Sequence, residues 1–220
     1  MLVIAHRGYH AAVPENTLAA FEAAVMAGVN GIETDVRISR DGLPVLMHDR
    51  IIASGQAVTD LARSEIERTL GYQVPTLDEA LEHFPDILWN VEIKTIEALP
   101  VVMTVLEKHQ AGRRILVTSF LHNLVATCAS SLKVNCGILV AHRPRTLSSL
   151  LADFNLDGNP RINHIVWDYN VLDGALLEQA AVEGYRNFVY GPITKAEHDD
   201  CLQLGVDAVI TDYPLLMQNV

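Results

Sequence analysis

Short apolar runs alternate with segments of helical periodicity along most of the chain. The apolar runs predict buried strands at residues 2–5, 31–36, 44–47, 87–93, 114–118, 134–140, 164–167, 187–190 and 208–211. Between them, apolar residues at helical spacing predict helices at residues 59–70, 99–108, 123–130, 146–154, 174–183 and 197–204. Strands that alternate with helices in this way are typical of a parallel sheet with helical crossovers.

Residues that commonly cap helices predict two more helices. Asn16 or Thr17 can cap the first of them, whose apolar face consists of Leu18, Phe21 and Val25. Thr76 is followed three residues later by Glu79, and this spacing fits a capping box at the start of the second. These signals extend the alternation of strand and helix over the first half of the chain.

About eight strands alternating with helices in a chain of 220 residues predict a (β/α)8 TIM barrel. We expect residues 1–220 to form a single barrel domain, since barrels of this length are commonly single units. An open, doubly wound sheet is the alternative. That fold would usually show a glycine-rich phosphate loop after the first strand, whereas Gly8 stands alone here.

Composition narrows the classes of function. Half of the residues are hydrophobic and the net charge is −11, which argues against a general nucleic-acid binder. A phosphate substrate is still compatible with this negative net charge, because a local cation reverses the sign of the electrostatic potential at a site.

The three cysteines, Cys128, Cys136 and Cys201, match no zinc pattern and predict buried, reduced thiols in a cytoplasmic protein. The apolar N-terminus is too short for a signal peptide, and no apolar run is long enough for stable membrane insertion.

Polar side chains of particular kinds follow successive apolar runs near the N-terminus. In chain order they are His6 and Arg7, then Glu33 and Asp35, then His48, and finally Glu92 and Lys94. The pairs Glu33/Asp35 and Glu92/Lys94 are spaced i, i+2, so on a strand both members of a pair face the same side. If the strands are parallel, all these groups meet at one mouth of the barrel, where such folds carry their sites.

These residue types suit metal-assisted hydrolysis of a phosphate ester. Three clustered carboxylates, Glu33, Asp35 and Glu92, repel one another unless a cation lies between them, and oxygen ligands favour Mg²⁺ or Ca²⁺. A neighbouring arginine and lysine suit an anionic substrate, above all a phosphate. Two histidines can share the proton transfers of such a reaction. Any one of these residues alone is more often structural, so the inference depends on their coincidence at strand ends.

At this level of detail the sequence resembles a known family. The motifs that carry the resemblance are His6-Arg7-Gly8, Pro14-Glu15-Asn16-Thr17, Glu33-x-Asp35, Asp41-Gly42, His48-Asp49, Glu92-Ile93-Lys94 and Thr211-Asp212-Tyr213-Pro214. Their order and spacing are similar to those of the glycerophosphodiester phosphodiesterases, which are related to the phosphoinositide phospholipase C barrels. The resemblance extends from His6 to Pro214 and is most specific in the N-terminal cluster.

The resemblance implies an activity and a role for each residue. The expected reaction is metal-dependent hydrolysis of a glycerophosphodiester to glycerol 3-phosphate and an alcohol. By resemblance, His6 and His48 are the general acid and base, and Arg7 and Lys94 hold the phosphate. The resemblance assigns Glu33, Asp35 and Glu92 to the divalent metal. The expected partner is a small-molecule phosphodiester.

The sequence departs from the family pattern in two regions. The loop after His48-Asp49 is shortened, which predicts a contracted cap insertion over the site. The residues near the seventh strand are Tyr190-Gly191-Pro192-Ile193, so an aromatic residue is kept and the family's asparagine is not. We expect Trp167, after the sixth strand, to form an aromatic wall for the substrate, with packing beneath a loop as the alternative.

Two other functions remain open at this stage. The barrel can act on a different phosphodiester, such as a lysophospholipid or an inositol or sugar phosphodiester. It can also be a non-catalytic barrel that binds phosphate and metal. The sequence leaves open the head group, the native metal, which histidine is the acid, a cyclic phosphate intermediate and the oligomeric state.

Overall fold

Eight parallel strands close into a barrel in the computed structural model, which describes residues 1–152 and 158–217. The barrel strands are β1 (Leu2–Ala5), β2 (Gly31–Ile38), β4 (Leu88–Ile93), β5 (Ile115–Ser119), β6 (Asn135–Val140), β7 (Ile162–Asp168), β8 (Arg186–Tyr190) and β9 (Ala208–Thr211). Closure comes from β1, which pairs with β2 on one side and with β9 on the other. The prediction of a (β/α)8 barrel is confirmed, and the open sheet is excluded.

The third extended segment is not a barrel strand. β3 (Pro44–Leu46) pairs antiparallel with β2, with Val36 opposite Leu46. It therefore lies beside the barrel as the second strand of a hairpin, and His48 follows this hairpin rather than the end of a parallel strand. The expectation that all the polar groups follow parallel strands is wrong for His48, although the hairpin returns the chain to the same end of β2.

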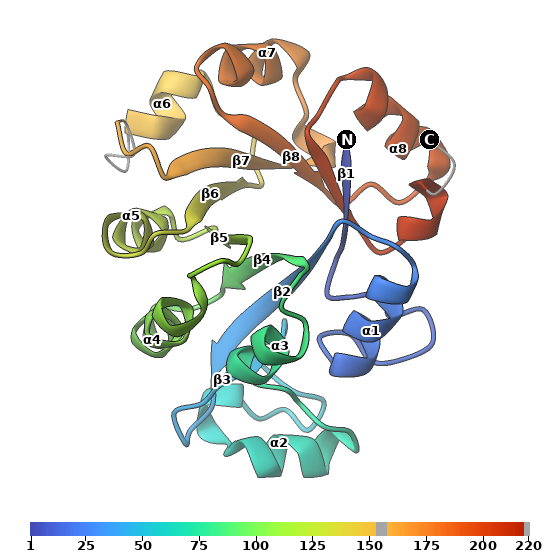
Figure 1. Cartoon of the computed structure of the whole chain (residues 1–220), viewed down its shortest axis with the longest axis vertical. Coiled ribbons are helices and arrows are strands. Elements are labelled where there is room, and N and C mark those ends of the chain that lie inside the picture. The colour runs from blue at the N-terminus through green and yellow to red at the C-terminus, as the bar shows by residue number, and fades with distance from the viewer. Residues whose placement is uncertain (153–157, 218–220) are drawn as a thin grey trace.

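Helices surround the barrel in a ring (Figure 1). The ring consists of α1 (Leu18–Met26), α3 (Leu77–His83), α4 (Leu99–His109), α5 (His122–Ser131), α6 (Leu147–Ala152), α7 (Gly174–Val182) and α8 (Lys195–Gln203), and α2 (Arg63–Leu70) lies outside it. Within the described residues, four 3₁₀ turns supplement these helices: η1 (Val58–Asp60), η2 (Ile96–Ala98), η3 (Tyr169–Val171) and η4 (Pro214–Met217). No helix in the described parts of the chain is long and apolar enough to cross a membrane.

Most helix predictions are confirmed, with some corrections. Thr17 caps α1 by accepting a hydrogen bond from the backbone N–H of Ala20, and the capping box of Thr76 and Glu79 is present. Val25 is 44% exposed and does not belong to the buried face of α1, because Ala24 takes that position. The segment 59–70 is split into η1 and α2. The predicted helix 146–154 corresponds to α6, and the end of that prediction lies outside the described residues.

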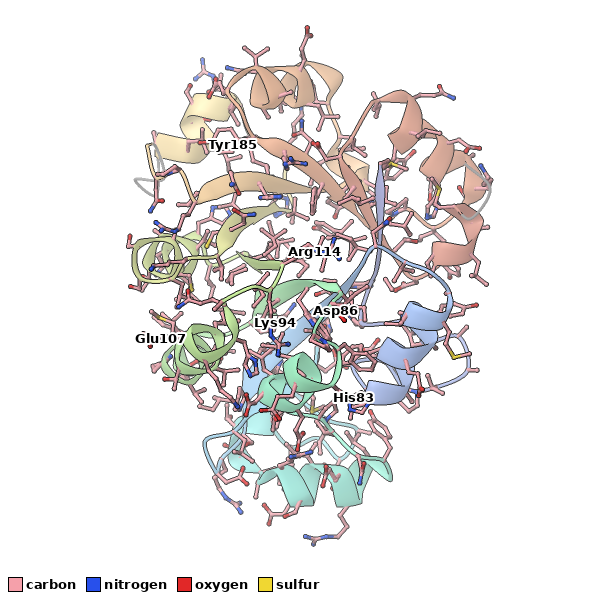
Figure 2. The ribbon with its side chains drawn as sticks, in the orientation of Figure 1. His83, Asp86, Lys94, Glu107, Arg114 and Tyr185 are labelled. Carbon is pink, nitrogen blue, oxygen red and sulfur yellow. The ribbon has the colours of Figure 1, made fainter. Side chains whose placement is uncertain are left out.

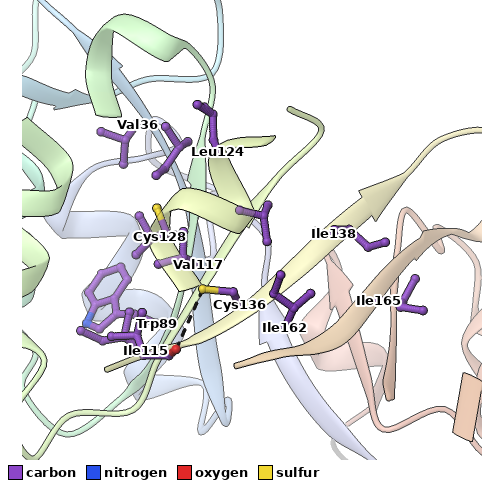
Figure 3. Close-up of a cluster of buried hydrophobic side chains, with 14 of the residues drawn as sticks. Val36, Trp89, Ile115, Val117, Leu124, Cys128, Cys136, Ile138, Ile162 and Ile165 are labelled. Atoms are coloured by element: carbon purple, nitrogen blue, oxygen red, sulfur yellow. Dashed lines mark hydrogen bonds between the residues drawn. The ribbon is translucent and has the colours of Figure 1, made fainter. Parts of the chain in front are cut away.

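Two apolar layers hold the barrel together. The smaller layer packs side chains from β1, β5, β6, β7, β8 and β9 against one another. The larger layer lies between strands and helices, and Figure 3 shows part of it, with Trp89, Cys128 and Cys136 among aliphatic side chains. All three cysteines are buried and free, as the sequence predicted. The helix layer thus fixes the strands whose C-terminal ends carry the polar groups.

The insertion between β3 and α3 has a small core of its own. Its buried side chains are Ile52, Val58, Leu61, Ile66 and Val74, which pack with Val45 of β3. Arg63 ties the insertion to α3, because its guanidinium donates to both carboxylate oxygens of Glu79 at 2.8 Å. In Figure 1 the helix of this insertion, α2, lies outside the ring of the other helices.

The turn after β1 has a strained backbone. Arg7 has a φ of 56° and Gly8 a φ of 79°, both in the left-handed region that favours glycine. At Gly8 a side chain is excluded as well, because a Cβ would lie 2.7 Å from the backbone carbonyl carbon of Ala20 in α1. The close approach of this turn to α1 therefore requires glycine.

We expect Gly8→Ala to destabilise the protein more than Gly28→Ala. Gly28 also has a positive φ, of 73°, but a Cβ there would meet nothing within 4 Å. In the control variant the free energy of unfolding should therefore fall only by the cost of a left-handed non-glycine residue, about 1–2 kcal/mol. In Gly8→Ala the free energy of unfolding should fall by a further ~1–3 kcal/mol, because the added methyl group overpacks the contact with α1. Urea unfolding measures both values, and equal losses would contradict the close-packing explanation.

Candidate active site

A cavity of about 140 Å³ lies at the C-terminal ends of the barrel strands. Its lining brings together six of the predicted site residues: His6, Arg7, Glu33, His48, Glu92 and Lys94. Asn90, Phe120, Leu139, Tyr190 and Ile210 complete the wall. Figure 2 shows Lys94 inside the ring of helices, whereas Glu107 of α4 lies at the outer edge. The structure thus gathers polar groups that are up to 88 positions apart in the sequence, from His6 to Lys94.

Three buried carboxylates lie close together on β2 and β4, and two of them, Glu33 and Glu92, line the cavity, whereas Asp35 lies behind its lining. Glu33, Asp35 and Glu92 each offer one oxygen, and these oxygens lie within 4.8 Å of one another. Register explains the meeting, because β2 and β4 are neighbours and Asp35 lies opposite Glu92. Oδ1 of Asp35 is buried, and its cationic neighbour is the ammonium of Lys94 at 3.2 Å. A compact set of buried carboxylates, whose negative charges outnumber the cations beside them, fits a hard divalent cation.

The pKa values of the three carboxyl groups reflect their burial and the repulsion between their charges. Burial raises the pKa of Glu33 well above its usual value, and the charges of Asp35 and Glu92 raise it further. Burial and the charge of Asp35 also raise the pKa of Glu92. For Asp35 burial acts in the same direction, but the charges of Lys94 and Arg7 outweigh it and lower the pKa. The pKa of Asp35 is therefore lowered, whereas the pKa values of Glu33 and Glu92 stay raised in the absence of further positive charge.

The two predicted phosphate ligands contact carboxylates in this structure. The ammonium of Lys94 lies 2.7 Å from Oε1 of Glu92 and 3.2 Å from Oδ1 of Asp35. Nη1 of Arg7 donates to both carboxylate oxygens of Glu15 at 3.0 Å, and its Nε lies 3.2 Å from Oδ2 of Asp35. Both cations thus border the cavity while they balance the acidic cluster.

Asn16, predicted from the sequence only as a possible helix cap, belongs to the site as well. Its side-chain amide donates to Oδ2 of Asp35 at 3.0 Å, and its amide oxygen accepts from the hydroxyl of Thr34 at 2.7 Å. The residue is buried and has a φ of 54°. Asparagine tolerates this left-handed conformation better than most residues. It therefore fixes one oxygen of Asp35, while Thr17 takes the capping role.

His6 is held by a residue from the other end of the chain. Its Nδ1 lies 2.7 Å from Oδ1 of Asp212, and Nε2 of His10 lies 3.1 Å from the same oxygen. The Nε2 of His6 lies 3.9 Å from Oε2 of Glu33. Burial opposes the ionised form of Asp212, but the hydrogen bond and charge of His6 outweigh it and lower the pKa to about 2. The carboxylate thus orients the imidazole so that Nε2 lies toward Glu33.

His48 has a more exposed partner. Its Nδ1 lies 2.9 Å from Oδ1 of Asp49, whose side chain is 75% exposed. The backbone of His48 is fixed from β2, because Nε of Arg37 donates to its carbonyl oxygen at 2.7 Å. The hairpin therefore anchors His48 through its main chain, whereas Asp212 anchors His6 through its ring.

The prediction that Trp167 forms a wall for the substrate is wrong. Its side chain is 1% exposed, and its indole N–H donates to Oδ1 of Asn187 at 2.9 Å within the outer core. The face of β7 on which it lies packs against helices, so the packing alternative holds. Phe120 and Tyr190 line the cavity instead, with ring centroids 6.1 Å apart in an edge-to-face contact.

A second group of possible metal ligands lies on the outer helices. It consists of Asp78, Glu82 and His109, on α3 and α4. Here the ammonium of Lys108 already donates to Asp78 at 2.9 Å and to Glu82 at 2.7 Å. These carboxylates are already paired with a lysine at the surface of the outer helices, unlike the buried carboxylates beside the cavity.

Comparison with known proteins decides the family. The family model described as "Glycerophosphoryl diester phosphodiesterase family" matches residues 6–216. The chain belongs to the glycerophosphoryl diester phosphodiesterase family. A glycerophosphodiester phosphodiesterase of Caldanaerobacter subterraneus is 30% identical over 247 aligned residues, which cover 100% of this chain and 97% of that protein. The resemblance inferred from the motifs is thus confirmed, and the chain is an enzyme of the phosphodiesterase class.

Solved structures of this family share the fold. A phosphodiesterase of Oleispira antarctica, solved in complex with sn-glycerol 3-phosphate as product, has a TM-score of 0.87 at 24% identity and covers 99% of this chain and 95% of its own. The glycerophosphodiester phosphodiesterase of Thermotoga maritima has a TM-score of 0.81 at 28% identity, with 98% and 96% covered. Both comparisons support the barrel.

We expect Asp212→Ala to lower kcat about 10- to 100-fold with little change in KM, the usual cost of losing a partner that orients a histidine. Asp49→Ala is the matched control, because Asp49 contacts the other histidine from an exposed position. The decrease in kcat of Asp49→Ala should stay below about 5-fold, the range expected for the loss of an exposed ion pair. Steady-state hydrolysis of a glycerophosphodiester with a neutral alcohol measures both. A larger loss for Asp49→Ala would contradict the orienting role of Asp212.

Proposed function

We propose that this phosphodiesterase hydrolyses glycerophosphodiesters to glycerol 3-phosphate and an alcohol, with a divalent metal and with His6 and His48 as general acid and base. The observation that carries the proposal is the cavity in which both histidines, a cluster of buried carboxylates, an arginine and a lysine meet. The substrate is a small molecule, and we propose a cytoplasmic location.

Glu33, Asp35 and Glu92 are the residues that would hold the metal, Mg²⁺ or Ca²⁺. A bound divalent cation would neutralise the cluster and polarise the phosphoryl oxygens. The donor set supports this assignment, because it consists only of buried carboxylates, and burial together with the charge of Asp35 raises the pKa of both Glu33 and Glu92. Arg7 and Lys94 border the same cavity and supply positive charge for the phosphate.

The histidines move the protons of the reaction. One imidazole removes a proton from the attacking oxygen, and the other gives a proton to the oxygen of the leaving alcohol. Asp212 supports this role for His6, because it holds Nδ1 and leaves Nε2 toward the cavity. His48 lines the same cavity from the hairpin side. The geometry is compatible with either assignment of acid and base.

The dimensions of the cavity suit the glycerol phosphate part of a diester. Its volume of about 140 Å³ is small beside the ~300–1,000 Å³ of pockets that enclose drug-sized ligands. Phe120 and Tyr190 offer ring surfaces to the carbon atoms of a glycerol, and Asn90 offers an amide. The Oleispira antarctica structure, described with sn-glycerol 3-phosphate as its product, supports this product for the present chain.

We expect Glu33→Gln to remove metal-dependent turnover of glycerophosphocholine. In the metal-free protein the same change should raise the free energy of unfolding, because it removes a buried charge that Asp35 and Glu92 repel. Added Mg²⁺ or Ca²⁺ should raise the Tm of the wild type and leave that of the variant unchanged.

Glu178→Gln is the matched control, since Glu178 is exposed on α7. It should behave as the wild type in both assays, and a chelator should abolish turnover in the wild type and the control alike. Full activity of Glu33→Gln, or of the wild type after complete chelation, would contradict the metal assignment.

His48→Ala should lower kcat by about 10² to 10⁴, the usual contribution of a general acid or base. The circular dichroism spectrum and Tm should change little, because His48 is partly exposed and lies beyond the end of β3. Turnover of glycerophosphocholine within 2-fold of the wild type would show that His48 transfers no proton.

A further inference from the structure

Two histidines share one carboxylate oxygen beside the catalytic cavity. Nδ1 of His6 lies 2.7 Å from Oδ1 of Asp212, and Nε2 of His10 lies 3.1 Å from the same oxygen. His6 and Asp212 follow β1 and β9, which pair with each other, whereas His10 belongs to the loop between β1 and α1. The proposed reaction uses His6 and leaves His10 without a role.

The loop after β1 is fixed against α1, and this gives His10 a defined place. Gly8 permits the left-handed turn that approaches Ala20, and the backbone N–H of Tyr9 donates to the carbonyl oxygen of Ala20 at 2.9 Å. The side chain of Tyr9 packs against the larger apolar core. The side chain of His10 is 25% exposed and lines a cavity of about 320 Å³, which Asp212 also lines. The turn thus brings His10 to the side of Asp212 that faces solvent.

The main chain around Asp212 does not depend on His10. The hydroxyl oxygen of Thr211 accepts a hydrogen bond from the backbone N–H of Tyr213 at 3.0 Å, which closes the turn that carries Asp212. Nε2 of His198, on α8, lies 2.9 Å from the same hydroxyl oxygen. These contacts fix the backbone and leave the rotation of the Asp212 side chain to its own partners. Because that side chain is 42% exposed, water would compete for Oδ1 if one of its two donors were missing.

The charge of Asp212 sets the direction of both hydrogen bonds. Burial opposes its ionisation, but the hydrogen bonds and charges of His6 and His10 outweigh burial and lower the pKa of Asp212 to about 2. An ionised carboxylate only accepts hydrogen bonds, so both ring nitrogens donate. His6 therefore carries a proton on Nδ1, and its neutral form has the lone pair on Nε2, which lies 3.9 Å from Oε2 of Glu33. This is the tautomer that can exchange a proton at the cavity through Nε2.

A bound metal does not explain the meeting of these three side chains. Two imidazoles and a carboxylate occur together as zinc ligands in other proteins. Among the described residues, however, His6, His10 and Asp212 are not one of the two groups whose ligand atoms all lie within 4.8 Å of one another. Two rings that donate to one carboxylate oxygen form a hydrogen-bond arrangement that fixes that oxygen.

We propose that His10 is a positioning residue for His6 and that it acts through Asp212. The second donor holds Oδ1 of Asp212 where His6 needs it, and so keeps the proton of His6 on Nδ1 and its Nε2 toward the cavity. The inference rests on the proposed function, in which His6 transfers a proton. His10 itself does not line the catalytic cavity, so its effect reaches the substrate only through the other two residues.

His10→Leu removes the donor and keeps a side chain that suits the apolar wall formed by Leu215 and Leu216. It should lower kcat for glycerophosphocholine about 3- to 10-fold, a part of the loss expected for Asp212→Ala, and leave KM within about 2-fold. His10→Gln should keep kcat within about 2-fold of the wild type, because its amide N–H replaces the ring N–H as donor. His83→Leu, which replaces an exposed histidine of α3, is the matched control and should change neither constant.

A double-mutant cycle separates positioning through Asp212 from a general structural effect. In the Asp212→Ala background, His10→Leu should change kcat by less than about 2-fold, because the residue through which it acts is gone. An equal loss in both backgrounds would show that His10 acts by another route, and would overturn the proposal. Unchanged kcat in His10→Leu, with Asp212→Ala impaired, would overturn it as well.

A long-range proton–nitrogen NMR spectrum of the imidazole rings measures the tautomer of His6 without turnover. The neutral ring of His6 should carry its proton on Nδ1 in the wild type and in His10→Gln, whereas His10→Leu should show a mixture of both tautomers. The same single tautomer in all three proteins would overturn the role of His10. Failure to hydrolyse any glycerophosphodiester would overturn the proposed function, and the spectra would still decide whether His10 fixes the tautomer of His6.

Discussion

The repulsion among three buried carboxylates is the constraint on which the site depends. Register between β2 and β4 brings Glu33, Asp35 and Glu92 together, and burial removes the water that would otherwise screen their charges. The chain offsets this with Arg7 and Lys94, which lower the pKa of Asp35 but leave the pKa values of Glu33 and Glu92 raised. A fold that maintains such an arrangement implies a further positive charge. We propose that a divalent metal supplies it, and in this family the substrate is a phosphodiester, whose negative charge such a centre can bind.

The rest of the barrel positions groups around this centre. The left-handed turn at Arg7 and Gly8 presses the loop after β1 against α1, and Asn16 fixes one oxygen of Asp35. Asp212, after the last strand, orients His6, and the β2–β3 hairpin brings in His48 from the other side. The insertion after the hairpin then forms the outer wall next to His48. The groups at the centre are thus positioned mainly by strands, whereas the wall next to His48 comes from a loop and an insertion.

Sequence alone predicted the barrel and most of the centre for a definite physical reason. A strand has a period of two, so Glu33-x-Asp35 and Glu92-x-Lys94 had to project to one side, and parallel strands end at one mouth. Three features escaped this reasoning because they depend on packing. β3 pairs antiparallel, and no local pattern distinguishes an antiparallel strand of three residues from a barrel strand. Trp167 lies on the helix side of β7. The contact of Asp212 with His6 spans 206 positions, which only closure of the barrel brings together.

One measurement tests the central claim most directly. A crystal of the protein equilibrated with Mn²⁺, a scattering substitute for the hard divalent cations, would give an anomalous difference map. Our account predicts a single strong peak at the catalytic cavity, with oxygens of Glu33, Asp35 and Glu92 as ligands and the ammonium of Lys94 displaced from Asp35. A peak elsewhere, or a cluster that keeps Lys94 between its carboxylates and binds no metal at saturating Mn²⁺, would contradict it.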